Sequence, residues 1–495
     1  MRLTTLAGAA LLALLSGCAS VPPTSQDQAQ SQAQAPAQAQ HQERAKNVIF
    51  FLGDGMGLNT LTAARIFHAG EEGELTIDRL PESAFVKTFS NDAMVTDSAA
   101  GMAAYMTGVK HNNGVISMSF GTRSIAPAKD ANGNALVSKC DNGEPAPTLL
   151  ELARRRGMAI GVVTNTSVTD ATPASAYGHG CHRKLENDFA AMLVPGGAGY
   201  NAALGARGLD VLFGGGAQFF TPFERGGKRA DGRDLLAELR AQGMRVVADS
   251  AGMGALGADP RQPAIGLFAA NHMDYDAARD PARQPSLTEM TRKAIDLLAP
   301  HAGTGKGSGK GFFLVVEGGL IDHALHATLG KRALQETVSY NAAMQAALEK
   351  MEALDPGLKH TLVVATADHD HTLLLNGYTV RTGKTTPTNP GVLGLVRNLD
   401  GSPMLDREGR PFTIIGFGTG EKRVNGSRGT QPALTDDIVT RDDYHQEAVV
   451  RTRPGAETHG GTDVYLGAAG AGAELFRGTI DNTRVFGLIK TAAGL

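Results

Sequence analysis

The folded part of the chain opens with residues 47–57, which read NVIFFLGDGMG. The run from Val48 to Leu52 is entirely apolar, which is typical of a strand buried on both faces of a parallel sheet. It stops at two glycines that enclose Asp54, and glycine at such a place favours a tight turn. This stretch therefore predicts a buried strand that presents a carboxylate at its carboxyl end.

Four later stretches repeat this pattern of an apolar run followed by a turn, and they are residues 159–164, 210–213, 312–316 and 361–366. Helical stretches separate them. Thr148 to Arg156 is one, with Gly157 as a plausible stop, and Leu334 to Ala353 is another, with apolar residues at helical spacing. This alternation predicts an α/β fold with a central, mostly parallel sheet sandwiched by helices.

Polar side chains follow the predicted strands where each strand ends. In parallel sheets these ends meet at one edge, where ligands bind. The side chains expected at this edge are Asp54, Thr172, Glu317, Asp368 and His369. The sequence therefore predicts a binding site there.

Further candidate metal ligands lie nearby in sequence. Asp322 and His326 are four residues apart, so a helix would place them on one face, although a surface ion pair also accounts for such spacing. His459 lies in the stretch ETHGG, residues 457–461, where the glycines predict a tight turn, although an isolated loop histidine is usually solvated. Imidazole and carboxylate ligands suit zinc, and sets of oxygen ligands suit magnesium. The sequence offers both kinds.

Ser98 is the candidate nucleophile. It lies in VTDSAAGMAA, residues 95–104, and we expect a helix to begin at Asp97 or Ser98. The start of a helix favours an anion, although a serine there can also be a plain helix cap. No histidine adjoins Ser98 as a general base, but a metal ion can activate a hydroxyl directly. These features predict metal-assisted phosphoryl or sulfuryl transfer.

Six motifs, in this order, resemble the alkaline phosphatase family, and in particular its bacterial lipoprotein-type members. They are FLGDGMG at 51–57, TDSAA at 96–100, DATP at 170–173, VEG at 316–318 with Asp322 and His326, TADH at 366–369, and ETHGG at 457–461. The resemblance implies hydrolysis of phosphate monoesters through a phosphoserine on Ser98, with two zinc ions and one magnesium ion.

The resemblance also implies a role for each ligand. The first zinc would be held by Asp322, His326 and His459, and the second by Asp54, Asp368 and His369. Asp54 would also reach the magnesium, which Thr172 and Glu317 complete. Arg183 matches the arginine that forks onto two phosphate oxygens, a geometry that suits a guanidinium.

Other residues near these motifs are expected to support the ligands. Asp170 and His323 match positions around the magnesium that vary within the family. We expect His179, His182 and His371 to lie outside the ligand sets, in the second shell or on the surface. Family resemblance also suggests small phosphate-monoester substrates and a homodimer.

The N-terminus predicts export. Arg2 and the apolar run from Leu3 to Leu15 lead into LSGC, residues 15–18, which resembles a bacterial lipobox with Cys18 as the lipidated residue. The alternative is an ordinary secretory signal that is cut nearby. Either way we expect a periplasmic or cell-surface protein, which on the first reading touches the membrane only through its lipid anchor.

The chain after Cys18 divides into two parts. Residues 19–44 are rich in Gln, Ala, Pro and Ser and predict a flexible tether. Residues 45–495 are the predicted catalytic domain. Within it, the Gly-, Pro-, Asp- and Arg-rich stretch 376–454 breaks the alternation of strands and helices, and predicts an inserted, crown-like subdomain.

Charge and cysteine content indicate which partners and which cross-links to expect. The net charge is -3, from 47 basic and 50 acidic residues, so nothing indicates a nucleic-acid-binding role. Apart from Cys18, the chain has only Cys140 and Cys181. In an oxidising compartment this pair predicts a disulfide, although two buried thiols are the alternative.

Three alternatives compete with a phosphomonoesterase. Two are a phosphodiesterase and a sulfatase of the same superfamily. Sulfatases use a modified Cys or Ser in a signature that this chain lacks, and many diesterase relatives use Thr and lack the arginine. The third is a non-catalytic lipoprotein that binds metal or phosphate, which the presence of both Ser98 and Arg183 disfavours.

Overall fold

The computed structural model describes residues 44–129, 140–259, 261–302 and 309–495. The predicted lipobox cysteine Cys18 and nearly all of the predicted tether therefore lie outside the described residues. No helix among the described residues combines the length and the apolar character needed to cross a bilayer.

A ten-stranded sheet forms the centre, in the order β15-β2-β14-β8-β1-β7-β3-β4-β6-β5. Seven neighbouring strands are parallel: β8 (Thr361–Thr366), β1 (Asn47–Gly53), β7 (Phe312–Gly318), β3 (Ala159–Ser167), β4 (Val211–Gly215), β6 (Ala264–Leu267) and β5 (Arg245–Val247). Beyond β8, β14 (Val464–Gly470) runs antiparallel to both β8 and β2 (Glu82–Lys87), and β15 (Gly478–Asp481) is parallel to β2. The predicted fold class is confirmed.

Strand β1 shows why helices cover both faces. All seven of its residues are buried, and successive side chains of a strand point to opposite faces. The ring of Phe50 packs at 5.7 Å from that of Tyr105, and Phe51 packs edge-on at 5.9 Å from Tyr340. Tyr105 belongs to α2 and Tyr340 to α10, so the apolar run of β1 requires a helix on each side.

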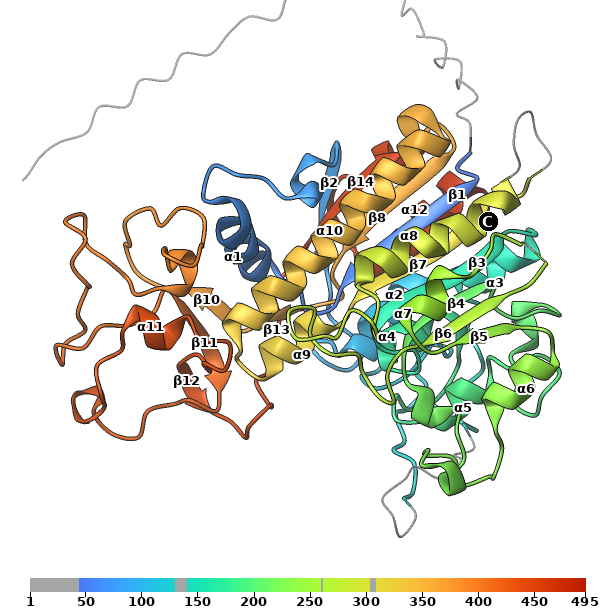
Figure 1. The fold of residues 1–495 in the computed structure, drawn as a ribbon, viewed down its shortest axis with the longest axis horizontal. Coiled ribbons are helices and arrows are strands. Elements are labelled where there is room, and N and C mark those ends of the chain that lie inside the picture. Colours follow the sequence, from blue (N-terminus) through green and yellow to red (C-terminus); the bar gives the residue numbers. More distant parts are fainter. Residues whose placement is uncertain (1–43, 130–139, 260, 303–308) are drawn as a thin grey trace, which may run out of the picture. The chain divides into compact units, whose positions relative to one another are not determined.

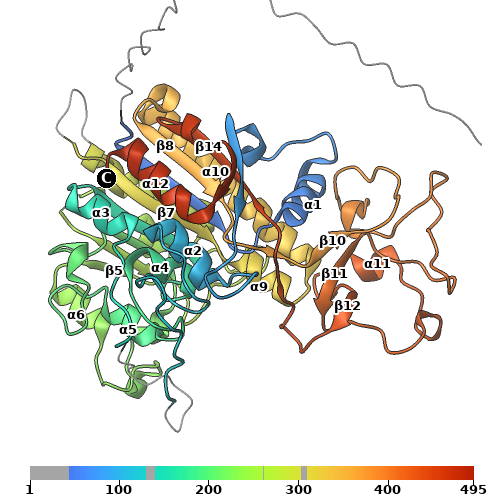
Figure 2. The same cartoon turned by 180° about the vertical axis from the view of Figure 1, so that it is seen from behind.

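The helices form two layers (Figures 1 and 2). One layer contains α1 (Leu58–Ala69), α8 (Leu287–Leu298) and α10 (Gly330–Leu354), and the other contains α2 (Ser98–Thr107), α3 (Leu149–Arg155), α4 (Ala171–Tyr177) and α12 (Asn482–Ala493). Shorter helices complete the fold, namely α5 (Glu186–Ala191), α6 (Leu235–Ala241), α7 (Ser250–Gly254), α9 (Leu320–His326) and α11 (Asp436–Val439).

Helix ends follow local sequence signals. Thr148 caps α3 and forms a reciprocal capping box with Glu151, and Gly157 adopts a φ of 80° just beyond the helix. Asp97 caps α2, because its carboxylate accepts a hydrogen bond from the Ala100 amide. Ser98 is therefore the first residue of the helix.

The stretch 376–454 lies beside the main sheet and carries part of a small sheet of its own (Figure 1). That sheet has the order β10-β11-β12, with β10 at Leu373–Leu375, β11 at Ile415–Gly420 and β12 at Ala448–Arg451. We call residues 376–454 the excursion. A further two-stranded ladder pairs β9 (Asp370–His371), which precedes the excursion in the sequence, with β13 (His459–Gly460), which follows it.

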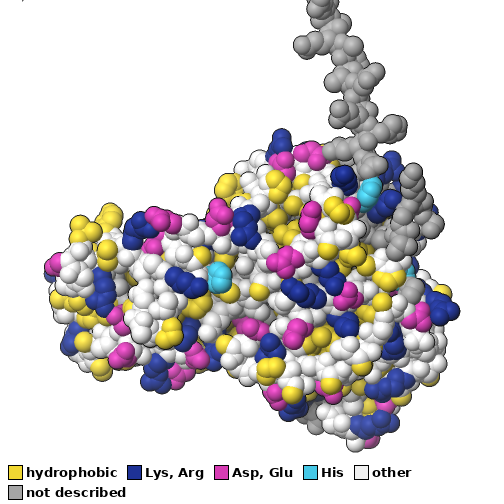
Figure 3. Space-filling model, turned by 45° about the horizontal axis from the view of Figure 1, so that its top comes forward, with side chains coloured by type: hydrophobic (Ala, Val, Ile, Leu, Met, Phe, Trp, Pro, Cys, Tyr) yellow, Lys and Arg dark blue, Asp and Glu magenta, His cyan; other side chains and the backbone are white. Residues whose placement is uncertain are grey.

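The surface matches the nearly neutral composition. On the face drawn in Figure 3, Lys and Arg are interspersed with Asp and Glu, without a broad area of one sign. This distribution gives no electrostatic footprint for a polyanion on that face.

A disulfide joins Cys140 to Cys181 across 41 positions of the chain. Cys181 is fully buried, and its carbonyl accepts a hydrogen bond from the Ile125 amide. The cross-link fixes the segment that leads to Arg183, two residues later.

We predict that replacing both Cys140 and Cys181 with alanine lowers the free energy of unfolding by about 4 kcal/mol, since the unfolded chain regains the entropy of a loop of this length. Thermal unfolding with and without a reductant checks this. Reductant should lower the midpoint of the wild type and leave that of the double variant unchanged. Equal midpoints for wild type and variant under oxidising conditions would contradict the prediction.

Candidate active site

Strand register brings three carboxylates to one edge of the sheet. Leu52 of β1 pairs with Glu317 on one side and with Thr366 on the other. Asp54 and Asp368 each lie two residues beyond the paired position, and because β1 lies between β7 and β8, Asp54 lies between Glu317 and Asp368 at the carboxyl ends of the three strands. All three are at most 5% exposed.

Asp322, His326 and His459 form a triangle of ligand atoms. The Asp322 Oδ1 lies 3.3 Å from the His326 Nε2 and 3.4 Å from the His459 Nε2, and the two nitrogens are 3.1 Å apart. Tetrahedral ligands with bonds of 2.0–2.1 Å to zinc are separated by about 3.3–3.4 Å. The triangle has the size of one face of such a site.

The second ring nitrogen of each histidine is held by backbone. The His326 Nδ1 bonds to the carbonyl of Glu457, and the His459 Nδ1 bonds to the carbonyl of Thr96 at 2.9 Å. These bonds fix both tautomers with the proton on Nδ1, so the Nε2 lone pairs face the triangle.

The expected tight turn at His459 is wrong. His459 and Gly460 form β13, which pairs with β9 so that His459 lies opposite His371. Gly460 is needed for close approach, because a Cβ there would lie 2.6 Å from the His371 carbonyl oxygen. Extended backbone, and not a turn, presents His459.

His371 and Glu457 support this triangle from behind. His371 is buried, and its ring joins the Asp322 Oδ1, at 2.7 Å, to a carboxylate oxygen of Glu457. Although burial opposes it, the charges of Glu457 and Asp322 raise the pKa of His371 to about 10. Because carboxylates engage both ring nitrogens, His371 orients Asp322.

A second group of ligand atoms surrounds His369. The His369 Nε2 lies 3.3 Å from the Asp54 Oδ1, 3.6 Å from the Asp368 Oδ2 and 3.2 Å from the Ser98 Oγ. Asp54 Oδ1 and Asp368 Oδ2 are buried and have no hydrogen-bond partner among the described residues. Buried carboxylate oxygens without a donor are costly unless a cation compensates them.

The pKa values of two of these carboxyl groups also reflect the cost of burying them close together. Burial, together with the charge of Asp54, holds the pKa of Asp368 well above its ordinary value. Burial and Asp54 also hold the pKa of Glu317 well above its ordinary value. A cation among these groups would relieve both effects.

An oxygen-only group adjoins the second one. The Thr172 hydroxyl donates to the Asp54 Oδ2 at 3.2 Å, and Glu317 lies near enough for the Asp54 charge to act on it. The hydroxyl of Thr166 donates to the Glu317 carboxylate at 3.1 Å, and that of Thr164 also donates to it. Hydroxyl and carboxylate oxygens suit magnesium.

Ser98 stands where these groups meet the start of α2. Small buried residues let the helix approach the sheet edge, and a Cβ on Gly101 would lie only 3.0 Å from Asp368. Asp97 anchors the turn before the helix by accepting from the amides of Ala100 and Gly114, each at 3.0 Å. The Ser98 hydroxyl is thereby fixed beside a site with a favourable helix dipole.

Arg183 is held by two carboxylates. Its Nη1 donates to the Asp97 Oδ2 at 3.1 Å, and its Nη2 lies 3.6 Å from the Asp170 Oδ1. Its Nε is buried without a hydrogen-bond partner among the described residues. Although burial opposes it, these carboxylates raise the pKa of Arg183, so the guanidinium is charged.

Asp170 joins a fourth group, with His272 and His323. The other carboxylate oxygen of Asp170, Oδ2, lies 3.9 Å from the His272 Nδ1 and 3.7 Å from the His323 Nε2. Although burial opposes it, Asp170 raises the pKa of His323 to about 9. His272 was missed from the sequence, yet it follows β6 at the same edge as Asp54 follows β1.

The remaining predicted residues lie outside the ligand groups. His179 bonds to the Ser117 carbonyl at 2.7 Å and to the Glu151 carboxylate at 2.8 Å. The His182 Nδ1 accepts from the Lys184 amide. Besides the triangle of Asp322, His326 and His459, ligand atoms of described residues lie within 4.8 Å of one another in these sets: Asp322, His369, His371 and His459; Asp170, His272 and His323; His326, His371 and Glu457; and Asp54, Asp368 and His369.

Comparisons with known proteins all point to one family. A family model described as alkaline phosphatase matches residues 45–495. The tissue-nonspecific alkaline phosphatase of Mus musculus is 34% identical over 464 residues, covering 88% of this chain and 81% of that protein. The membrane-bound alkaline phosphatase of Bombyx mori is 31% identical over 477 residues, covering 89% of this chain and 78% of that protein.

Solved structures are also similar. The alkaline phosphatase of Thermus thermophilus superposes with a TM-score of 0.64 at 25% identity, covering 92% of each chain. That of the Antarctic bacterium TAB5 superposes with a TM-score of 0.60 at 22% identity, covering 91% of this chain and 98% of that one, which supports the fold alone.

We predict that Asp368→Asn stabilises the metal-free protein and weakens its response to zinc. Because the pKa of Asp368 is raised on folding, ionisation above its ordinary pKa opposes folding, and neutralisation should gain about 1–3 kcal/mol at about pH 8. Thermal unfolding in a chelator and then in zinc measures both effects.

Asp443→Asn, at an exposed carboxylate of the excursion, is the matched control and should change neither midpoint. A metal-free Asp368→Asn protein that unfolds at a lower temperature than metal-free wild type would contradict the prediction.

Proposed function

The chain belongs to the alkaline phosphatase family, and we propose that Ser98 is the nucleophile with which it hydrolyses phosphate monoesters. The protein is a phosphomonoester hydrolase. The observation that carries the assignment is the Ser98 hydroxyl at the start of α2, 3.2 Å from His369 and beside unpartnered buried carboxylate oxygens. Among the described residues, no neighbouring histidine is free to serve as an ordinary general base, since His369 belongs to a ligand group.

We propose that the site holds two zinc ions and one magnesium ion. The first zinc would be bound by Asp322, His326 and His459; the second by Asp54, Asp368 and His369; and the magnesium by Asp54, Thr172 and Glu317. When bound, these cations would lower the pKa of the Ser98 hydroxyl and balance the negative charge of the phosphoryl oxygens. Metal analysis of the purified protein tests the stoichiometry, and a different set of ions would overturn it.

The residues of the chain account for the transfer itself. The Ser98 Oγ forms a bond to phosphorus as the bond from phosphorus to the ester oxygen breaks, and the alcohol leaves with a proton. Water then attacks the phosphoserine, and phosphate and the free serine are restored. Arg183 holds the phosphoryl group, because its Nε is unpartnered and Asp97 and Asp170 keep the guanidinium in place.

We further propose export and anchoring through Cys18, with residues 19–44 as the tether. The apolar run before Cys18 supports the proposal. The mass of the mature N-terminus, with or without a lipid, tests it.

We also propose a homodimer. Phe85, Phe89, Met94 and Phe120 are 44–81% exposed, and three of them line one cavity with Gly461, close in sequence to His459. An exposed group of large apolar side chains near a site is typical of a protein interface. Light scattering of the purified protein tests this, and a stable monomer would overturn it.

We predict that Ser98→Ala lowers kcat for p-nitrophenyl phosphate by at least about 10³-fold, because no covalent phosphoryl intermediate can form. Trapping of acid-stable phosphoprotein should succeed with the wild type and fail with the variant. Ser402→Ala, at an exposed serine of the excursion, should behave as wild type. Faster wild-type hydrolysis of bis-p-nitrophenyl phosphate or p-nitrophenyl sulfate than of the monoester would favour the sister activities instead.

We predict that Arg183→Lys lowers kcat/KM by about 10–100-fold, since an ammonium keeps the charge but cannot make the forked contact. Arg225→Lys, at an exposed ion pair with Asp234, is the matched control and should retain wild-type kinetics. Unchanged kcat/KM in the Arg183 variant would rule out a role in holding phosphate.

A further inference from the structure

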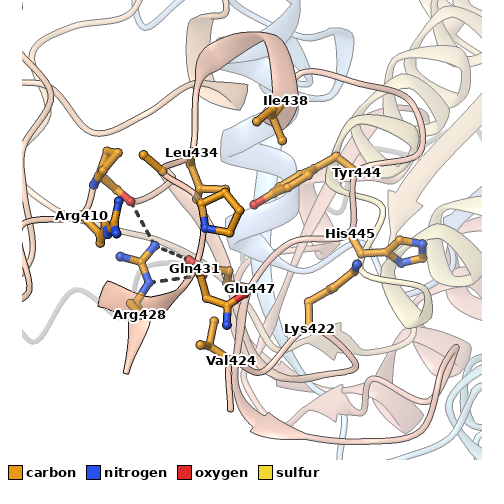
Figure 4. Close-up of a pocket in the computed structure, with 13 residues that line it drawn as sticks. Arg410, Lys422, Val424, Arg428, Gln431, Leu434, Ile438, Tyr444, His445 and Glu447 are labelled. Carbon is orange, nitrogen blue, oxygen red and sulfur yellow. Dashed lines mark hydrogen bonds and ion pairs between the residues drawn. The ribbon is translucent and has the colours of Figure 1, made fainter. Parts of the chain in front are cut away.

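A separate pocket lies in the excursion, away from the residues of the candidate site (Figure 4). Its volume is about 310 Å³, which lies at the lower end of the range for small-molecule sites. One part of its lining is apolar and the other is cationic. The apolar part comprises Pro411, Val424, Pro432, Ala433, Leu434, Ile438 and the ring of Tyr444, and the cationic part comprises Arg410, Lys422 and Arg428. Gln431, His445 and Glu447 complete the polar lining.

The cationic part is not fully neutralised. Arg428 is satisfied, because it forms ion pairs with Glu447, at 2.8 Å, and with Asp406. Neither Arg410 nor Lys422 has an ion-pair partner among the described residues, and the Arg410 Nη2 donates only to the carbonyl of Gly429. Two positive charges therefore remain to attract an anion.

The arrangement of these groups limits the shape of the ligand. In Figure 4 Arg410 and Lys422 stand on opposite sides of the view, and Leu434 and Tyr444 lie above the space between them. An inorganic anion would leave the apolar part of the lining exposed to water, and an uncharged hydrocarbon would leave the cations unpaired. An anion with an apolar body of one or two rings satisfies both parts.

The pocket is connected to the turn that follows His326. His445, which lines the pocket, bonds through Nδ1 to the carbonyl of Ala327 at 2.7 Å. The next residue, Gln446, donates its amide to the Thr328 carbonyl at 2.9 Å. Thr328 has a φ of 54°, an unfavourable value for a β-branched residue, so these bonds hold a strained turn directly after α9.

We propose that this pocket is an effector site for a small organic anion with an aromatic body, and that its occupancy is transmitted through residues 444–447 and 327–328 to His326. A ligand that shifts the segment 444–447 changes the support of the strained turn. By linkage, the ligand and a metal ion bound at His326 then alter each other's affinity by the same factor.

Naphthalene-2-sulfonate is the probe, measured by calorimetry in the presence of excess phosphate to occupy the candidate active site. We expect a Kd below about 1 mM for wild type. Lys422→Glu should weaken binding by at least about tenfold, and Leu434→Asp should do the same from the apolar side. Lys384→Glu makes the same charge change at an exposed site of the excursion outside the pocket, and should bind as wild type.

Two related compounds separate charge from apolar surface. Methanesulfonate and 2-naphthalenemethanol should each bind at least about tenfold more weakly than the probe, since each lacks one of the two features. Equal binding of the probe to wild type and to Lys422→Glu would overturn the site, as would wild-type binding of either analogue with the affinity of the probe.

The coupling is tested by repeating the titration with metal-free and zinc-loaded protein. We expect the probe affinity to differ by at least about threefold between the two forms, and the difference to vanish in His445→Ala, where the bond to Ala327 is lost. Identical affinities in the two wild-type forms would overturn the coupling. Because this readout is binding, it does not depend on the assignment of Ser98.

Discussion

Repulsion among buried carboxylates is the constraint on which the rest of this structure depends. The register of β8, β1 and β7 brings Asp54, Glu317 and Asp368 to one edge, where water is excluded. The unpartnered oxygens of Asp54 and Asp368, together with the raised pKa values of Glu317 and Asp368, mean that the fold stores electrostatic strain at this edge. A bound cation would relieve that strain, so the arrangement that costs stability without a cation would also favour cation binding.

Five strands of the central sheet, β1, β3, β4, β7 and β8, were predictable because they are buried on both faces, whereas the short strands β5 and β6 were not predicted. A short, continuous apolar run such as Val48 to Leu52, bounded by glycine, is characteristic of a strand in that environment. The strands β2, β14 and β15 were not predicted, for the opposite reason. Glu82–Lys87 is exposed at alternate positions, and VYLGAAG at 464–470 is rich in glycine and alanine, so their pairing depends on the neighbouring strands and not on their own sequence.

The candidate ligands were found where a local pattern marked them, such as a carboxylate or imidazole after a strand. Residues that act by bridging distant segments carried no such pattern. Glu457 meets His371 across 86 positions, and Arg183, which meets Asp97 across the same number, was identified only through the family resemblance. His272 was missed although it does have a local pattern, since it follows β6 as Asp54 follows β1. The turn expected at His459 failed because glycine there serves close approach to β9.

The excursion and the metal-binding groups share backbone at both ends, which is why an irregular segment can matter to the chemistry. It leaves the main body just after His371 and returns just before Glu457 and His459, and β9 pairs with β13 where the two ends meet. Glu457 also accepts from the Thr372 amide at 2.8 Å, and Thr372 accepts from the Thr419 amide of β11 at 3.2 Å. A shift of the small sheet would therefore displace residues that orient Asp322 and His459. The packing of the excursion and the geometry of the ligands are coupled through these contacts.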